Sequence, residues 1–389
     1  MPFTLGKDNI IGDNIIAALE QSNRVCEVYL RALAGWQVEI FLAAMQVPFP
    51  ELTLMQLFSN DETLPVIPGS FLSGSAPPRL RVFRLGHIPF PAIPKLLLDA
   101  TCLVSLRLSD IPHSAYISPE AMVALISVSP SLEALILEFK SPRSRPDWES
   151  RSLPPPKRSI LPALKSLGFR GVTEYLEELV TRIDTSRLDS IDITFFNQID
   201  FDCPRLAQFI NRTPNLRALD EAIVFFDDST ALIRLGYWTS ESDEDELIIY
   251  IPCREPDWQL SSIEQICNSS LHPLSTVEDL IIEHDYSKLF WQDDAIENTL
   301  WLQLLLPFTA VINLYLFKEF APGIAAALQE LVEGRITEVL PSLENIFVRG
   351  LETSGPFQEN IGQFVAARQR SGHPIAISVW DKNSNMKSM

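Results

Sequence analysis

Apolar residues recur along the chain in one short pattern: an apolar residue, two residues of any type, a second apolar residue, one more residue, and a third apolar residue. The stretch LVSLRLSDIP, residues 103–112, is one example, with Leu103, Leu106 and Leu108 at the three apolar positions. The last three positions alternate, so in a short strand two apolar side chains point to one face and the residue between them to the other. Ten segments fit this pattern: Val25/Val28/Leu30, Phe49/Leu52/Leu54, Leu80/Phe83/Leu85, Leu103/Leu106/Leu108, Leu132/Leu135/Leu137, Leu164/Leu167/Phe169, Leu188/Ile191/Ile193, Val277/Leu280/Ile282, Val311/Leu314/Leu316 and Leu343/Ile346/Val348.

Segments between these strands have the spacing of amphipathic helices. In SPEAMVALISVSP, residues 118–130, Ser118 is a candidate N-cap ahead of an apolar-rich segment. In GVTEYLEELVTRI, residues 171–183, apolar residues share one stripe, and Glu177 is expected to lie outside it with the neighbouring glutamates. Further helices are predicted in the same way, with Gly334 and Gly372 as helix ends, over residues 203–214, 323–334 and 360–372.

One strand and one helix per repeat, each too small to bury its own apolar face, predict a solenoid whose core forms by stacking of neighbouring repeats. A doubly wound α/β fold would need longer, entirely apolar strands and a glycine-rich loop after the first strand, and the sequence has neither. We therefore predict an α/β solenoid with a curved parallel sheet that forms a single domain over residues 1–389.

Two segments interrupt the repeats. Residues 141–159 are rich in proline and basic residues, which predicts a solvated loop; the alternative is a docking or phosphorylation segment. Residues 222–252 contain three alternating apolar segments, which predict a small antiparallel β excursion resembling a hairpin insertion. The acidic run SESDEDE, residues 240–246, lacks the glycine and spaced carboxylates of a calcium loop, so we expect a solvated loop tip there.

The strand pattern resembles the leucine-rich repeat family in its long, irregular form, with a helix in every repeat. Outside the less regular region between Leu188 and Val277, the distance between successive templates runs from 23 residues, Leu80 to Leu103, to 34 residues, Val277 to Val311. The Asn or Cys that family repeats carry three residues after the third apolar position is replaced by apolar residues here: Ile88, Ile111, Val172 and Phe196. The resemblance covers nearly the whole chain.

Two segments, residues 161–222 and 253–267, resemble more specifically the repeat region of F-box proteins that are abundant in mushroom-forming (basidiomycete) fungi. In that family an N-terminal F-box binds the Skp-type adaptor of a cullin-RING ubiquitin ligase, and the repeats hold the protein to be ubiquitinated. The resemblance therefore implies a substrate receptor. No segment like Leu-Pro-x-Glu-Ile-Leu precedes the first template strand, so we expect either an F-box encoded upstream or a stand-alone repeat scaffold.

Composition narrows the classes of partner. The chain is 46% hydrophobic and 21% charged, enough apolar residues for a large core. Its formal net charge of −19 argues against a nucleic-acid partner, because nucleic-acid binders need clustered Lys and Arg to displace counterions. Five irregularly spaced cysteines predict reduced, buried thiols in an intracellular protein of the cytoplasm or nucleus. Polar residues and Pro307 interrupt the most apolar stretch, residues 300–317, so we expect no membrane span.

The sequence contains no catalytic or metal-binding motif that favours an enzyme. No histidine has a second His or a Cys three or four positions away, and phosphate-loop, dinucleotide-loop and nucleophile-elbow motifs are absent. The cluster Glu283, His284 and Asp285 lies on successive residues of a strand, whose side chains alternate between faces and cannot converge. We therefore expect neither a cofactor nor enzymatic activity.

Candidate partner-binding residues occupy the position between the last two apolar residues of each template, which faces away from the core. In chain order this position holds Tyr29, Thr53, Arg84, Arg107, Ile136, Gly168, Asp192, Ile281, Tyr315 and Phe347. We predict binding through Arg84, Arg107 and Asp192, and through an exposed apolar patch of Ile281, Tyr315, Phe317 and Phe347. The C-terminal segment, residues 373–389, is expected to add a final strand and a cap, with Trp380 over part of this patch.

Overall fold

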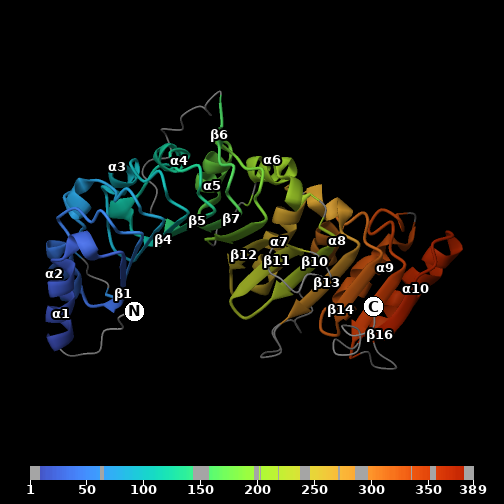
Figure 1. Cartoon of the computed structure of the whole chain (residues 1–389). Coiled ribbons are helices and arrows are strands. Elements are labelled where there is room, and N and C mark those ends of the chain that lie inside the picture. The colour runs from blue at the N-terminus through green and yellow to red at the C-terminus, as the bar shows by residue number, and fades with distance from the viewer. Residues whose placement is uncertain are drawn as a thin grey trace. The chain divides into compact units, whose positions relative to one another are not determined.

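The structure is a computed structural model of the 389-residue chain, and it divides into two compact units, residues 1–191 (unit 1) and residues 192–389 (unit 2). It describes residues 9–61, 65–142, 157–196, 201, 203–217, 219–236, 246–269, 272–284, 297–333, 335–350 and 356–380. Each unit is a run of strand–helix repeats (Figure 1).

Unit 1 is built on a parallel sheet whose strands follow chain order. The strands are β1 (Glu27–Leu33), β2 (Leu54–Ser59), β3 (Val82–Gly86), β4 (Ser105–Ile111), β5 (Ala134–Phe139) and β7 (Ser166–Gly171), followed by β9 (Ser190–Phe195), which crosses the unit boundary. The helices are α1 (Asn9–Leu19), α2 (Gly35–Ala44), α3 (Ile93–Leu97), α4 (Pro119–Ser127) and α5 (Thr173–Val180), with 3-10 turns η1 (Ser22–Arg24), η2 (Phe71–Gly74) and η3 (His113–Ala115). A separate parallel pair joins β6 (Ser159–Ile160) to β8 (Ile183–Asp184).

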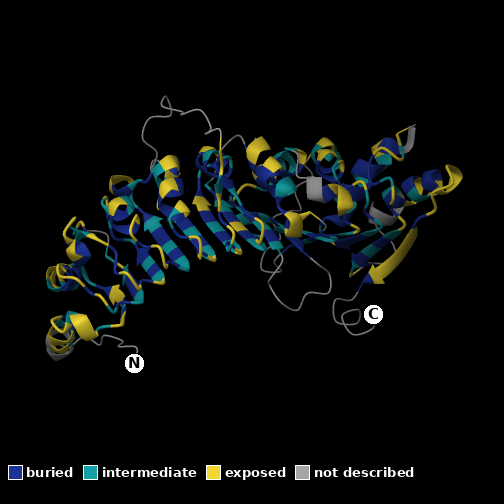
Figure 2. Cartoon of the chain, turned by 45° about the horizontal axis from the view of Figure 1, so that its top comes forward, coloured by how far each residue is buried: buried dark blue, intermediate teal, exposed yellow. Residues whose placement is uncertain are grey.

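The apolar template forms the core of unit 1 because its residues stack from strand to strand. Leu106 and Leu108 of β4 have the same register as Phe83 and Leu85 of β3, and all four side chains are buried. Along most strands of unit 1, such as β5, buried residues alternate with partly exposed ones (Figure 2), whereas in β2 Gln56 is buried as well. Neighbouring repeats therefore bury each other's apolar face, as the solenoid prediction requires.

One template was placed in the wrong register. The sequence pattern assigned Phe49, Leu52 and Leu54 to the second strand, but β2 aligns Met55 with Phe83 and Leu57 with Leu85. The apolar positions of this repeat are therefore Leu52, Met55 and Leu57, all of which are buried. Two overlapping frames fit the same letters, and only strand pairing distinguishes them.

Unit 2 has a mixed sheet with the strand order β12-β11-β10-β13-β14-β15-β16. These strands are β10 (Glu221–Phe226), β11 (Thr230–Gly236), β12 (Glu246–Pro252), β13 (Asp279–His284), β14 (Asn313–Phe317), β15 (Asn345–Arg349) and β16 (Ala376–Trp380). Its helices are α6 (Pro204–Arg212), α7 (Pro256–Asn268), α8 (Asn298–Leu305), α9 (Ala321–Gln329) and α10 (Pro356–Arg370), with 3-10 turns η6 (Pro214–Leu216), η7 (His272–Thr276) and η9 (Glu330–Glu333).

The predicted antiparallel strands are present, and they are part of the main sheet of unit 2. β10, β11 and β12 pair antiparallel in sequence, while β10 also pairs in parallel with β13. Leu219, Ala222 and Val224 are fully buried at the template spacing, so β10 occupies a repeat position that the sequence pattern missed. Since Ala222 is a small residue, this repeat lacked the bulky apolar residue by which the others were found.

Most helix predictions hold in the described residues. The side chain of Ser118 accepts a hydrogen bond of 3.2 Å from the backbone N–H of Ala121, as an N-cap does. Gly372 follows α10 with φ of +85°. Glu177, expected outside, is only 9% exposed, so that expectation is wrong. Gly334 lies outside the described residues.

The structure also bears on the expected burial of the cysteines and on the apolar stretch 300–317. Cys203, Cys253 and Cys267 are buried free thiols as expected, but Cys26 and Cys102 are exposed, also as free thiols. The apolar stretch 300–317 divides between α8 and β14. In the described part of the chain, no helix has both the length and the hydropathy needed to cross a bilayer.

Candidate functional site

The strand residues that point away from the apolar core form the open face of unit 1. Strand pairing aligns one residue from each strand in a single row: Tyr29, Gln56, Arg84, Arg107, Ile136 and Gly168. The structure therefore brings the predicted Arg84 and Arg107 together at paired positions on β3 and β4. Thr53 does not belong to this row, because of the register error in β2, and Gln56 takes its place.

Three arginines of this face, Arg31, Arg84 and Arg107, are called the arginine surface. Arg107 donates hydrogen bonds from Nε to Oγ of Ser109 at 3.0 Å and from a terminal nitrogen to Oε1 of Glu138 at 3.2 Å. The side chain of Arg107 remains 41% exposed despite this ion pair. Arg84 is half-buried, and its Nε is buried without a hydrogen-bond partner among the described residues.

Arg31 is an exposed residue that the sequence pattern did not single out. Its guanidinium carbon lies 4.6 Å from the centre of the Tyr29 ring and 6.0 Å from that of Phe58. With the Gln56 amide oriented so that its oxygen faces Arg31, that oxygen accepts two hydrogen bonds at 2.7 and 2.8 Å. The aromatic contacts and the two hydrogen bonds to the Gln56 oxygen fix the position of the guanidinium. Arg31 lies two residues beyond the predicted row, so a search of one position per repeat could not find it.

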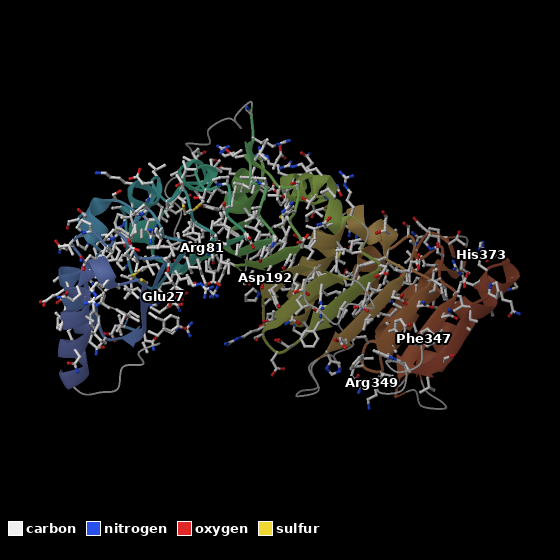
Figure 3. All side chains as sticks on the ribbon, in the orientation of Figure 1. Glu27, Arg81, Asp192, Phe347, Arg349 and His373 are labelled. Atoms are coloured by element: carbon white, nitrogen blue, oxygen red, sulfur yellow. The ribbon has the colours of Figure 1, made fainter. Side chains whose placement is uncertain are left out.

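The open face of unit 2 carries the predicted apolar residues. Pairing aligns Ile281, Tyr315 and Phe347 on β13, β14 and β15, and the Tyr315 and Phe347 rings stack with centres 4.7 Å apart. The Trp380 ring lies 5.2 Å from that of Tyr315 and 5.8 Å from that of Phe317. Figure 3 labels Phe347 together with Arg349, the next residue of β15 on this face.

The prediction of an exposed patch is wrong for three of these residues. Ile281, Tyr315 and Phe317 are 7%, 8% and 2% exposed, and only Phe347 is half-buried. Side chains at paired positions of neighbouring strands lie close enough for aromatic rings to cover one another, and Trp380 adds to this cover from β16. These rings therefore pack as a small core of their own.

A polar row runs beside the aromatic residues in unit 2. The Asn345 amide donates to Oδ1 of Asn313, and the Asn313 amide donates to Oδ1 of Asp279, each at 2.9 Å. Burial raises the pKa of Asp279, and the hydrogen bonds that Asn313 and Tyr315 donate partly oppose this effect. Burial also raises the pKa of Tyr315, with Asp279 as a further cause.

Glu221 pairs with Asp279 across β10 and β13, so two carboxyl groups are neighbours in this row. Burial raises the pKa of Glu221 to about 7; Arg234 opposes the shift, and Asp279 adds to it. Arg234 also lies 3.0 Å, from Nε to Oε2, from Glu246 at the start of β12. The Glu221 carboxyl thus gains or loses its proton near neutral pH.

The remaining predicted residues do not form a catalytic or metal site. Asp192, labelled in Figure 3, is exposed on β9. Burial is the first cause of the raised pKa of Tyr250, and Asp192 contributes to it. Glu283 is half-buried, whereas His284 is buried and lies 3.1 Å from Glu319, so the two do not converge. Within the described ranges, no group of three His, Cys, Asp or Glu side chains could hold a metal ion. Asp285, most of the basic loop 141–159 and most of the acidic run 240–246 lie outside the described residues.

Strand–helix repeats, whose template strands pair in parallel with their neighbours within each unit, define the class of this protein: an α/β solenoid of the leucine-rich repeat type. No protein-family model matches the chain, and no curated protein matches it significantly. Among the solved structures that match is the leucine-rich repeat-containing protein LegL7 from Legionella pneumophila. It is 11% identical to this chain over 79% of this chain and 76% of its own, with a TM-score of 0.29.

Proposed function

We propose that the chain is a protein-interaction module that binds its partner through the open face of the strands. The observation that carries this proposal is the arginine surface of unit 1. Arg84 and Arg107 lie side by side at positions that contribute nothing to the apolar core. Charged side chains presented at a regular strand spacing provide a recognition surface, because each repeat contributes one residue to the row.

The more specific proposal is a substrate receptor of the F-box type for a cullin-RING ubiquitin ligase. It is supported by the resemblance of residues 161–222 and 253–267 to the repeat region of such proteins. In this proposal the repeats hold the protein to be ubiquitinated, and a Skp-type adaptor binds an F-box that precedes the repeats in the full transcript. Five free cysteines fit an intracellular location, where thiols stay reduced.

The test is affinity purification of the tagged full transcript product from its native organism, followed by identification of the bound proteins. A receptor is expected to recover a Skp-type adaptor together with a cullin and at least one further protein. Recovery of partners without an adaptor would overturn the receptor role and leave a stand-alone scaffold. Recovery of no specific partner would overturn the interaction module itself.

A further inference from the structure

We propose that the arginine surface of unit 1 binds an extended, carboxylate-rich segment of the partner protein. This inference rests on the proposed function, that the open face binds a protein, and it specifies the chemistry of the segment. Four features of the surface carry it: its charge, the half-buried guanidinium of Arg84, the spacing of the three guanidinium groups and the small residues beside them.

The charge of this surface contrasts with that of the chain. The formal net charge is −19, yet residues 1–191 contain 18 Lys and Arg against 20 Asp and Glu, whereas residues 192–389 contain 13 against 30. Like charges at paired positions repel, so the Arg84–Arg107 pair is unfavourable unless an anion lies near both. Within the described residues, Glu138 is the only acidic side chain that forms an ion pair with the arginine surface.

Arg84 has hydrogen-bonding capacity that the described residues do not use. Its Nε is buried and lacks a partner there. Buried donors are normally satisfied, and a guanidinium offers paired N–H groups whose geometry matches the two oxygens of a carboxylate. A carboxylate from a partner that binds the half-buried guanidinium from the open face would reduce the repulsion between Arg84 and Arg107.

The spacing of the arginines fits an extended chain that crosses the strands. Neighbouring strands lie about 4.8 Å apart, so Arg84 and Arg107 are one strand apart. Arg31 is two strands from Arg84 and two residues further along its strand, which places the two positions about 12 Å apart. An extended chain advances about 3.3 Å per residue, so side chains three or four residues apart span about 10 to 13 Å. Acidic residues at that spacing reach Arg31 and the Arg84–Arg107 pair together.

Small residues beside the arginines leave room for a peptide backbone. Ser105, Ala134 and Ser166 are aligned on β4, β5 and β7, two residues before the row that contains Arg107 and on the same face. The small side chains beside the arginines therefore allow the backbone of a bound peptide to approach the sheet closely.

A polyanionic nucleic acid is the other ligand that arginines could take. The backbone charge of nucleic acid is continuous, and its binding requires many basic contacts over a long surface. The formal charge of −19 opposes such a ligand, whereas a short acidic segment needs only the local surface. The observations therefore favour the acidic segment.

The experiment is a fluorescence anisotropy titration of the full chain against a fluorescein-labelled peptide of alternating Glu and Gly. Matched peptides of alternating Gln and Gly, and of alternating Lys and Gly, serve as controls. We expect saturable binding of the Glu peptide alone, and a Kd that rises as salt increases from about 50 to 500 mM. Binding of the Glu peptide no tighter than the Gln peptide would overturn the proposal.

Variants locate the binding on the surface. Arg84→Gln with Arg107→Gln is expected to weaken the Glu peptide at least about tenfold, since charge-assisted hydrogen bonds are lost. Arg335→Gln, at an exposed ion pair with Glu338 in unit 2, is the matched control and should leave Kd unchanged. Ile136→Glu provides a second route, because it adds a carboxylate at the position paired with Arg107 and should compete with the peptide. If the folded Arg84→Gln/Arg107→Gln variant or the folded Ile136→Glu variant binds the Glu peptide as the original chain does, the arginine surface is not the binding site.

Two further outcomes separate the alternatives. Tighter binding of a single-stranded DNA oligomer than of the Glu peptide would overturn the acidic segment in favour of nucleic acid. Failure of the peptide titration, with partners still recovered by affinity purification, would overturn this inference and leave the proposed function standing. Recovery of no partner would overturn the proposed function and, with it, this inference.

Discussion

The ring of Phe58 on β2 lies across Gly86 at the paired position of β3, in the space that a side chain at Gly86 would fill. A Cβ at residue 86 would overlap the ring, so the glycine is required by the neighbouring strand. The same ring lies beside the guanidinium of Arg31, which links the glycine to the arrangement of the arginine surface.

Gly86→Ala is therefore expected to destabilise unit 1 by about 1–3 kcal/mol, because the ring must move out of its packed position. Phe58→Leu removes part of the ring and should make the alanine better tolerated. A double-mutant cycle from urea unfolding is expected to give a coupling energy of about 1 kcal/mol between the two sites. Strictly additive effects would show that the ring does not depend on the glycine.

Two glycines of α10 and its C-terminus are expected to respond in opposite directions to alanine. Gly372 has φ of +85°, its N–H donates to the carbonyl of Gln369, and the N–H of His373 donates to that of Arg368, which together form a Schellman cap. Gly372→Ala should cost about 1 kcal/mol, since alanine is strained at positive φ.

Gly362 is the matched control because it lies within the same helix, where an added Cβ meets nothing within 4 Å. Gly362→Ala should stabilise the protein by about 0.5–1 kcal/mol through helix propensity. Thermal unfolding of both variants tests the pair. Equal shifts in Tm of the same sign would contradict the cap.

Arg368 of α10 is fully buried and binds the carbonyl oxygens of the preceding repeat. Its guanidinium donates to four of them at 3.1–3.4 Å: Ile336, Leu340, Pro341 and Leu343. Arg368→Met should destabilise unit 2 by about 2–4 kcal/mol, because it leaves buried carbonyls without donors. Arg370→Met, at an exposed position of the same helix, is the control, and urea unfolding should show a change below about 0.5 kcal/mol. Similar losses in both variants would contradict a specific role for Arg368.

The raised pKa of Glu221 predicts that the free energy of unfolding depends on pH. Its pKa is raised to about 7 by burial, against about 4.5 without the shift. Between these values the folded state holds a proton that the unfolded state releases, so stability falls as pH rises from about 4.5 to 7 and levels off above. After allowance for solvent screening, the loss is about 1–2 kcal/mol.

Glu221→Gln removes this titration. The variant should match the original chain near pH 4.5 and exceed its stability by about 1–2 kcal/mol above pH 7, with a residual slope from Asp279. Glu338→Gln, at an exposed position, is the control and should show no such divergence. Urea unfolding across this pH range is the measurement, and an equal difference at both ends would contradict the account.

The sequence predicted the repeat from local spacing because each apolar rung, such as Leu103, Leu106 and Leu108, is specified within six residues. Prediction from the sequence failed for residues whose exposure or register depends on contacts with other strands. Tyr315 and Phe317 read as exposed, yet Trp380, more than sixty residues later, covers both rings. The β2 register and the Ala222 rung likewise depend on pairing with neighbouring strands rather than on the letters themselves.

The sequence predicted only part of the arginine surface, again because some of its residues depend on contacts between strands. One position per repeat was enough to align Arg84 with Arg107, since parallel pairing preserves equivalent positions. Arg31 and the buried Gln56 that accepts its hydrogen bonds were missed, because their positions depend on the β2 register and on contacts with Tyr29 and Phe58.

The central claim, that the open face of unit 1 is the surface that binds the partner, is tested most directly by site-specific photo-cross-linking. A photoreactive amino acid is placed at Ser105, on β4 beside the arginine surface, or at Ala124, exposed on α4 at the helical side. The tagged protein is irradiated during partner recovery from its native organism. The account predicts a cross-linked partner from position 105 and none from position 124. A partner cross-linked from position 124 and not from position 105 would contradict it.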